Sequence, residues 1–256
     1  AITPQPQGFE GANALTYGSI GADKKLSVET DADEYEYIVT YQWYKNTTNS
    51  KDGAVAIGTE KDLAIENGLN AGDYYYYCKI TVTRKDNGES TSVDTELVKV
   101  TVNKATVAVP TAASKVYTGS TLKADISETA DYTVTTNNGG ITVGQYDVVL
   151  NLKDSANYKW SDGTETAAKT IKFEIKKATA NAITGLAIEG WTFGESAKTP
   201  SASATFGTPA FTYVGTDETD YAENATPPAN AGTYKVIAKV ADTTNYAGAS
   251  DEMTFT

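Results

Sequence analysis

Histidine does not occur in this sequence of 256 residues. It is the commonest general base in enzymes and the commonest metal ligand, so a Ser–His triad is excluded. Carboxylates alone could still support glycoside hydrolysis, which needs two of them across a cleft, but no part of the sequence concentrates acidic residues in that way. We therefore expect a protein that is not an enzyme and that binds no metal and no cofactor.

Cysteine is nearly absent as well. Cys78 is the single copy, so no disulfide can form within the chain and apolar cores must stabilise the fold. Cys78 falls on the inward face of a predicted core strand, where cysteine acts as a small apolar residue. A nucleophile would need exposure and a positive neighbour. We interpret Cys78 as structural.

Positive charge is scarce and scattered. The formal net charge is −12, and no block of basic residues is present to neutralise phosphate groups. Nucleic acids and anionic membrane surfaces are therefore disfavoured as partners. The sequence has no apolar run that could span a bilayer and no signal peptide, so we expect no direct membrane insertion. Because the chain begins with Ala1 and stops at Thr256 inside a predicted strand, we expect a monomeric segment of a longer protein.

The residues that are abundant favour β-sheet. The chain has 17 tyrosines and many threonines and valines, and its turns are rich in glycine, asparagine and aspartate. Long apolar stripes with helical spacing are missing. This composition predicts an all-β fold.

A short motif occurs three times. Asn70-Ala71-Gly72-Asp73-Tyr74 returns as Asn230-Ala231-Gly232-Thr233-Tyr234 and, in shortened form, as Gly144-Gln145-Tyr146. Apolar and polar residues alternate after each copy, which is typical of an antiparallel strand with one buried face. The three copies predict three tandem β-sandwich domains in an elongated array.

A second repeat locates the domain junctions. Val102-Asn103-Lys104-Ala105-Thr106 matches Ile175-Lys176-Lys177-Ala178-Thr179, so the last strand of one domain is expected to run directly into the first strand of the next. The predicted domains are residues 1–103, 104–178 and 179–256. Such short linkers prevent neighbouring domains from tumbling freely, so we expect a semi-rigid array.

The strands expected in the first domain are Leu26–Glu29, Tyr35–Lys45, Ala54–Ile57, Leu63–Ile65, the strand that follows Tyr74, and Leu97–Val102. In the second of these, alternation places Tyr37, Val39, Tyr41 and Trp43 on one face and Ile38, Thr40, Gln42 and Tyr44 on the other. The dipeptide Asn87-Gly88 predicts a hairpin turn that leads to the final strand.

Trp43 and the corner Asn70-x-Gly72-x-Tyr74 resemble the immunoglobulin-like sandwich. The resemblance implies that the Trp packs between two sheets and that a Tyr at the start of a late strand hydrogen-bonds back to the preceding turn. In that family a Cys lies two residues after the corner Tyr. Either Tyr74 is the corner and Cys78 comes two residues late, or Tyr76 is the corner; the copy at Tyr234 favours Tyr74. Val28 or a neighbour replaces the family's first Cys.

The later domains have their own signatures. The strands expected there are Thr106–Val109, Lys115–Tyr117, Leu122–Ile126, Tyr132–Thr135, Tyr146–Leu152, Thr170–Ile175, Trp191–Glu195, Phe211–Tyr213, Tyr234–Val240 and Met253–Phe255. Val116-Tyr117-Thr118-Gly119, Asn157-Tyr158-x-Trp160, Gly190-Trp191-Thr192-Phe193-Gly194 and Asn245-Tyr246-x-Gly248 resemble the MBG-type and related Ig-like repeats of bacterial, mainly Gram-positive, cell-surface proteins. The resemblance implies an extracellular location, at the cell surface or secreted, and no activity. Trp160 and Trp191 lie inside these signatures, so packing in a core or between domains is favoured for both.

The densest acidic group is formed by Asp31, Asp33 and Glu34. A solvated loop is the favoured interpretation. A weak calcium site is the alternative, but the group lacks the ligand spacing and the glycine of known calcium loops. A Lys–Asn crosslink, known in some Gram-positive surface domains, would need a buried Lys, Asn and acid together, and no such trio can be assigned.

One cluster is a candidate binding site. If Trp43, Tyr76 and Cys78 point inward, then Tyr44, Tyr75 and Tyr77 point outward on neighbouring strands, with Gln42 beside them and Lys79 at the edge. Exposed tyrosines stack on sugar rings and anchor protein contacts. The alternatives are that the rings only stabilise the sheet as cross-strand pairs, or that a neighbouring domain covers them.

These observations predict a non-catalytic stalk or spacer with adhesion of its own, whose partners would be glycans or host or cell-surface proteins. The alternative is an array of carbohydrate-binding modules in a surface system that binds or degrades polysaccharides.

Overall fold

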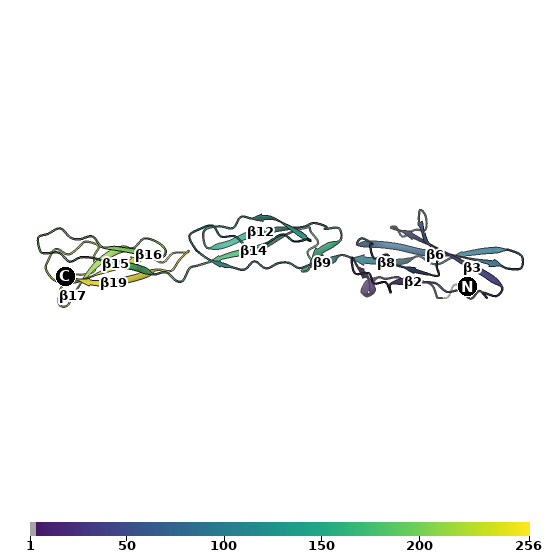
Figure 1. The fold of residues 1–256 in the computed structure, drawn as a ribbon, viewed down its shortest axis with the longest axis horizontal. Coiled ribbons are helices and arrows are strands. Elements are labelled where there is room, and N and C mark those ends of the chain that lie inside the picture. Colours follow the sequence, from purple (N-terminus) through teal and green to yellow (C-terminus); the bar gives the residue numbers. More distant parts are fainter. Residues whose placement is uncertain (1–3) are drawn as a thin grey trace. The chain divides into compact units, whose positions relative to one another are not determined.

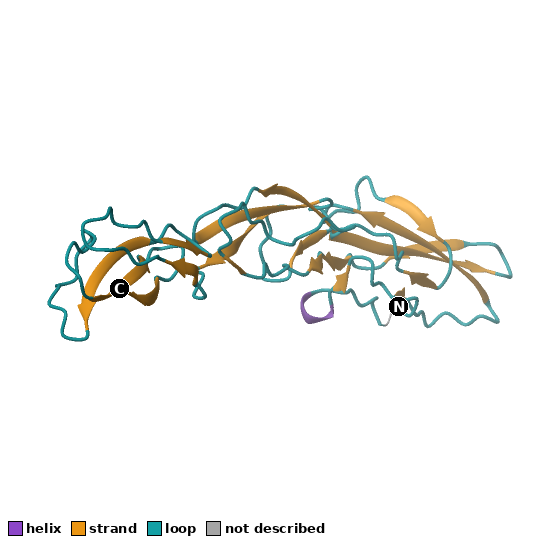
Figure 2. Ribbon diagram, turned by 60° about the vertical axis from the view of Figure 1, so that its left-hand side comes forward, coloured by secondary structure: helices purple, strands orange, loops and turns teal. Residues whose placement is uncertain are grey.

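The structure is a computed structural model, and it describes residues 4–256. The described chain contains nineteen strands and one short helical turn, η1 (Gly11–Asn13). Figure 2 shows strands joined by loops, with that turn as the only helical ribbon. The predicted all-β class is confirmed.

Internal contacts divide the chain into two units. One contains residues up to 109 together with 129–133 and 151–169, and the other contains 110–128, 134–150 and 170–256. The boundary passes through strands of the second predicted domain. The division into domains 1–103, 104–178 and 179–256 stays a prediction.

The largest sheet lies within the first unit and has the strand order β1-β8-β6-β3-β4, with β7 also paired to β6. Its members are β1 (Leu15–Thr16), β3 (Tyr37–Asn46), β4 (Val55–Gly58), β6 (Gly72–Arg84), β7 (Ser90–Asp94) and β8 (Val98–Asn103). The pairing of β3 with β6 is antiparallel along the full length of β3, and β1 runs parallel to β8. Figure 1 labels β3, β6 and β8 in this sheet.

A second, two-stranded sheet completes the sandwich. It consists of β2 (Lys25–Ser27) and β5 (Asp62–Ala64). Leu26 from this pair and Val28 just after it share one apolar core with Trp43, Cys78 and other residues of the large sheet. The strand order, with β1 parallel to β8 at one edge, is that of an immunoglobulin-like domain.

Trp43 is fully buried, and its indole Nε1 donates a hydrogen bond of 2.9 Å to the carbonyl of Glu60. The corner residue is Tyr74, whose hydroxyl donates to the carbonyl of Asn70 at 3.0 Å. Tyr76 is instead a buried core residue. The choice between the two registers is therefore settled in favour of Tyr74.

The prediction for the end of the first domain is wrong in one respect. The turn at Asn87-Gly88 leads to β7, which pairs back onto β6 through Thr83 and Ser90, and not directly to the final strand. The hairpin dipeptide was placed correctly, but all five residues of β7 are exposed. Without a buried face, the strand lacks the apolar alternation that marks the others.

Residues 104–178 contain β9 (Ala105–Val107), β10 (Lys115–Val116), β11 (Tyr132–Asn137), β12 (Gly144–Leu152), β13 (Tyr158–Trp160) and β14 (Ala168–Lys176). Four of them form a sheet in the order β10-β14-β12-β11, and β9 pairs with β13. The strand predicted at Leu122–Ile126 is wrong. Only Leu122 makes a bridge, to Gly140, and the Asn137 side chain takes the N–H and C=O of Ala124 in place of a neighbouring strand.

Residues 179–256 contain β15 (Ile183–Ala187), β16 (Ser201–Ala204), β17 (Ala210–Thr216), β18 (Thr233–Val240) and β19 (Ala249–Phe255). The last three form a sheet in the order β17-β18-β19. The strand predicted at Trp191–Glu195 is wrong, because this segment forms a turn in which the Glu195 amide bonds to the Thr192 carbonyl. The pair β15–β16 was not predicted from the sequence. Its strands are short and mostly polar or small, so they carry little period-2 signal.

The corner recurs at every copy of the motif. The hydroxyl of Tyr146 donates to the carbonyl of Thr142 at 2.7 Å, and that of Tyr234 donates to the carbonyl of Asn230 at 2.7 Å. In each case, as at Tyr74, the acceptor lies four residues before the tyrosine. The strand that follows buries alternate residues, so the motif starts a core strand three times, as predicted.

An asparagine holds the segment around the first Lys-Ala-Thr repeat. The Asn157 side-chain oxygen accepts a hydrogen bond of 2.8 Å from the Ala71 amide, and the Asn157 carbonyl accepts one of 2.9 Å from the Ala105 amide. Asn157 is 7% exposed. The neighbouring Tyr158 packs edge-on against Tyr17, with ring centroids 5.4 Å apart.

The second Lys-Ala-Thr repeat is held in the same way. The Asn245 side-chain oxygen accepts from the Val143 amide at 2.9 Å, and the Asn245 carbonyl accepts from the Ala178 amide at 2.9 Å. Tyr246 lies against Tyr117, with centroids 6.1 Å apart. The described structure therefore contains two copies of one arrangement, in which an Asn-Tyr turn bonds to the chain at a Lys-Ala-Thr repeat.

We expect Tyr74→Phe to speed amide hydrogen exchange in β6 roughly fivefold, because one neutral hydrogen bond contributes about 1 kcal/mol. Tyr35→Phe is the matched control, since Tyr35 is 93% exposed and its change should leave exchange in β6 unaltered. Equal exchange rates in the Tyr74 variant and the unchanged chain would show that the corner bond does not stabilise this strand.

Candidate functional site

The candidate site lies on the outer face of the large sheet of the first unit. Tyr44 is on β3, and Tyr75 and Tyr77 are on β6. Their chain neighbours Trp43, Tyr76 and Cys78 are buried, so alternation turns the three tyrosines away from the core. All three are half-buried. Their predicted placement on one face agrees with the structure; ligand binding there stays a prediction.

Tyr44 and Tyr77 form a stacked pair. They lie directly opposite each other in the β3–β6 register, with ring centroids 4.8 Å apart and ring planes 7° apart. Tyr75 precedes Tyr77 by two residues on the same face and lies opposite Asn46 of β3 and Lys99 of β8. The three rings therefore share one side of the sheet without forming a single stack.

Charged side chains border the pair. Lys51 Nζ lies 4.9 Å from the centroid of the Tyr77 ring and 3.4 Å from the Asp94 carboxylate. Burial raises the pKa of the Tyr77 hydroxyl, with a further contribution from Asp94. Lys51 and Asp94 were missed from the sequence, because Lys51 is in a polar loop and Asp94 is on the unpredicted β7. The Ser-Thr-Ser-Val run before Asp94 was the available signal for that strand.

Gln42 has a mainly structural position. Its Nε2 donates hydrogen bonds to the carbonyls of Trp43 at 3.1 Å and Gly58 at 3.0 Å, across the register shift between β3 and β4. Both amide hydrogens are thereby used, so only the side-chain carbonyl oxygen could accept a bond from a ligand.

The hydroxyl groups of Tyr44, Tyr75 and Tyr77 form no hydrogen bond within the described residues. This distinguishes them from the corner tyrosines Tyr74 and Tyr234, whose hydroxyls are bonded to backbone carbonyls. Tyrosine rings with open hydroxyls can pack against a ligand and exchange hydrogen bonds with it.

Cys78 lies beneath this surface and is fully buried. Burial raises the pKa of its thiol to about 11. The backbone amide of Cys78 donates a 2.9 Å hydrogen bond to the hydroxyl of Thr95, which is itself completely buried. These surroundings are those of a core residue, as predicted from the sequence.

The acidic loop has a structural role in the described chain. The Asp33 side chain accepts a hydrogen bond of 2.8 Å from the Tyr35 amide, and its carbonyl accepts from the amides of Glu36 and Tyr37. Among residues 4–256, no group of three or more Asp, Glu or Cys side chains is arranged to hold a metal ion. Within residues 4–256, the buried polar residues are Thr95 and Asn157. No lysine in this range is buried, although a Lys–Asn crosslink would require one.

The two later tryptophans take part in packing. Trp160 is fully buried and donates to the carbonyl of Ala167 at 3.2 Å. Trp191 is partly buried and stacks on Phe255, with centroids 5.2 Å apart. Neither is placed as a binding residue of the tyrosine surface.

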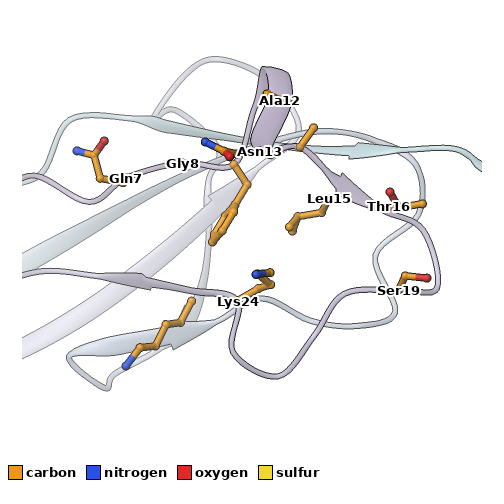
Figure 3. A pocket seen from close by; sticks show the side chains of 11 residues that line it. Gln7, Gly8, Ala12, Asn13, Leu15, Thr16, Ser19 and Lys24 are labelled. Carbon is orange, nitrogen blue, oxygen red and sulfur yellow. The ribbon is translucent and has the colours of Figure 1, made fainter.

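A hollow of about 500 Å³ lies beside η1 and β1 in the first unit. Figure 3 shows Leu15, Asn13 and Lys24 around it. Lys24 is paired with Asp23 at 2.8 Å. The lining has no carboxylate or thiol, so we assign the hollow no chemistry.

The sequence matches no protein-family model and no curated protein sequence. Among solved structures it is similar to the N-terminal four Ig domains of Dscam1 isoform 4.44, at 10% identity over 98% of this chain and 74% of that chain, with a TM-score of 0.26. Immunoglobulin domains 1–4 of Sidekick-1 are similar at 11% identity over 98% and 74%, with a TM-score of 0.22. Drosophila N-cadherin EC1–4 is similar at 10% identity over 95% and 71%, with a TM-score of 0.22.

At these scores, no ligand or partner is transferred from those proteins to this chain. The immunoglobulin-like assignment rests on the strand order, Trp43 and the corner at Tyr74. No helix within residues 4–256 has the length and apolar character needed to cross a membrane.

We expect Cys78 in the folded chain to react with a thiol reagent at about pH 8 at least a hundredfold more slowly than in the urea-unfolded chain, because burial blocks access and disfavours the thiolate. Folding raises the pKa of the Cys78 thiol. The stability that this thiol contributes is therefore present below its unfolded pKa of 9.0 and is lost as the pH rises towards about 11. Equal labelling of folded and unfolded chains would contradict this placement.

Proposed function

We propose that this chain is a non-catalytic segment of a bacterial surface or secreted protein, in which three domains, residues 1–103, 104–178 and 179–256, act as a spacer. The observation that carries the proposal is the repeated junction. An Asn-Tyr turn bonds to the amide of Ala71 in one copy and to the amide of Val143 in the other. Because the same contacts occur twice, we interpret them as a specific connection between neighbouring domains.

The linkers support a spacer because they are too short to let neighbouring domains move freely. Lys104 alone separates β8, which ends at Asn103, from β9, which starts at Ala105. Its Nζ donates to the carbonyl of Ser155 at 2.8 Å, and Lys177 in the second copy pairs with Asp242 at 2.7 Å. The exposed Lys177–Asp242 ion pair contributes little, so the hydrogen bonds to the asparagine supply most of the specificity.

The bacterial origin and the MBG-type repeat are part of this proposal. They are supported by the signatures around Tyr117, Trp160 and Trp191 and by the use of apolar cores without disulfides. An extracellular location follows from the same resemblance. The tyrosine surface, with open hydroxyls beside the Lys51–Asp94 ion pair, supports a role in binding or spacing over catalysis.

Small-angle scattering tests the spacer. A compact protein of this length would have a radius of gyration of about 18 Å, and we expect a clearly larger value. The double change Asn157→Ala and Asn245→Ala should broaden the distribution of distances, because both junctions lose the bond to the preceding amide. Asn49→Ala is the control, since Asn49 lies exposed in a loop. A value near that of a compact globule would refute the spacer.

A second function, carbohydrate or protein binding, is favoured by the tyrosine surface. The stacked Tyr44–Tyr77 pair and the nearby Tyr75 keep their hydroxyls free of bonds to the described residues. Aromatic faces bind sugar rings by stacking, and tyrosine is enriched among the residues that dominate protein interfaces. If the surface has this second function, the first domain binds a ligand and the other two domains position the first.

We expect the chain to bind a polysaccharide or glycan on an array, and Tyr44→Ala with Tyr77→Ala to weaken that binding by about thirtyfold or more, as for an interface hot spot of about 2 kcal/mol. Tyr44→Phe with Tyr77→Phe separates ring stacking from hydroxyl bonding. Tyr35→Ala is the control, since Tyr35 is exposed and precedes β3 at the end of that strand far from Tyr44. Circular dichroism would verify that each variant folds. Undiminished binding by the double alanine variant would exclude this surface.

A further inference from the structure

The two junctions share the same docking side, the surface on which the Asn-Tyr turn lies. It consists of a backbone amide three residues before the corner tyrosine, Ala71 in one copy and Val143 in the other. It also has an aromatic residue, Tyr17 or Tyr117. The backbone amide of this residue donates a hydrogen bond to the carbonyl at the end of the last strand, that of Asn103 or Lys176. A glycine with positive φ comes directly after Tyr17, Gly18 at +69°, and two residues after Tyr117, Gly119 at +82°.

The same parts occur a third time in residues 179–256. Ala231 precedes the corner Tyr234 by three residues, as Ala71 precedes Tyr74. Phe193 takes the place of Tyr17, because Trp191-Thr192-Phe193-Gly194 aligns with Leu15-Thr16-Tyr17-Gly18, and Gly194 has a φ of +92°. The strand register agrees as well, since Tyr234 pairs with Phe255 as Tyr74 pairs with Val100.

In this third copy the docking side is open. Phe193 is 72% exposed, whereas Tyr17 and Tyr117 are partly covered by the tyrosine of an Asn-Tyr turn. The amide of Ala231 has no hydrogen-bond partner within residues 4–256. A hollow of about 360 Å³ lies between them, lined by Trp191, Phe193, Ala231, Tyr234 and Phe255 among others.

We propose that this hollow is a docking site for the Asn-Tyr turn of a further domain of the same repeat type, joined after Thr256. The incoming asparagine would accept a hydrogen bond from the Ala231 amide, and the incoming tyrosine would pack on Phe193. The third site resembles the first most closely. Asn230 stands where Asn70 does, and Asn70 accepts a bond of 3.2 Å from Asn157 Nδ2.

A second copy of this chain does not fit as the occupant. The sequence contains two Asn-Tyr pairs, Asn157-Tyr158 and Asn245-Tyr246. Both asparagines are already bonded, to Ala71 and Val143 respectively. The occupant is therefore a domain with its own free turn, and the proposal is independent of the tyrosine surface and of any ligand bound there.

An extended chain tests the proposal. A copy of Val102-Asn103-Lys104 followed by a copy of residues 178–256 would be added after Thr256, which reproduces the spacing of the first junction. We expect exchange of the Ala231 amide, followed by NMR, to slow by about tenfold or more relative to the present chain, because the amide gains a hydrogen bond. Trp191 fluorescence should change as water leaves the hollow.

Two variants of the extended chain make the result specific. Asn245→Ala in the added copy should restore fast exchange at Ala231 while the β18 amides of that copy remain protected. Phe193→Ala should weaken the protection, and as Phe193 is largely exposed the change should leave the fold intact. Exchange that is equal with and without the extension, or protection that survives Asn245→Ala, would overturn the proposal. Concentration-dependent protection in the present chain would overturn it in favour of self-association.

Discussion

A tyrosine hydroxyl bonded to the carbonyl four residues earlier sets up three core strands of this molecule, β6, β12 and β18. The bond occurs at Tyr74, Tyr146 and Tyr234. Because it closes the turn against the strand that follows, it determines which alternate residues of that strand enter the core. The same turn leaves an amide, three residues before the tyrosine, directed away from its own sheet. Ala71 and Val143 use that amide to bind an asparagine.

Asparagine suits this position because one residue offers two acceptors. The side-chain oxygen of Asn157 takes the amide of Ala71, while its backbone oxygen takes the amide of Ala105, just after the linker. The residue therefore bonds to the chain on both sides of Lys104 and removes freedom from the linker. Aspartate could accept the same bonds but would bury a charge, and Asn157 is only 7% exposed. This short, bonded connection is what the proposed spacer would need.

The tyrosines of the chain divide by what their hydroxyls do. Tyr74 and Tyr234 bond to backbone carbonyls and belong to the scaffold. Tyr44 and Tyr77 stack on each other at 4.8 Å with their hydroxyls open, which leaves polar groups available to a partner. This difference places the first set in the scaffold and is consistent with the contact role proposed for the second.

The sequence by itself determined the all-β class, the faces of β3 and β6, and the recurrence of the corner, because period-2 alternation and turn chemistry are local properties. It failed at β7, whose residues are all exposed, and at Leu122–Ile126, where the Asn137 side chain replaces a strand. Only the tertiary structure decided that Asn157 bonds to Ala71, 86 residues away, and that Asp94 and Lys51 lie at the tyrosine pair. Those contacts depend on strand order and register, which are fixed by burial across the whole sandwich rather than by any short stretch of residues.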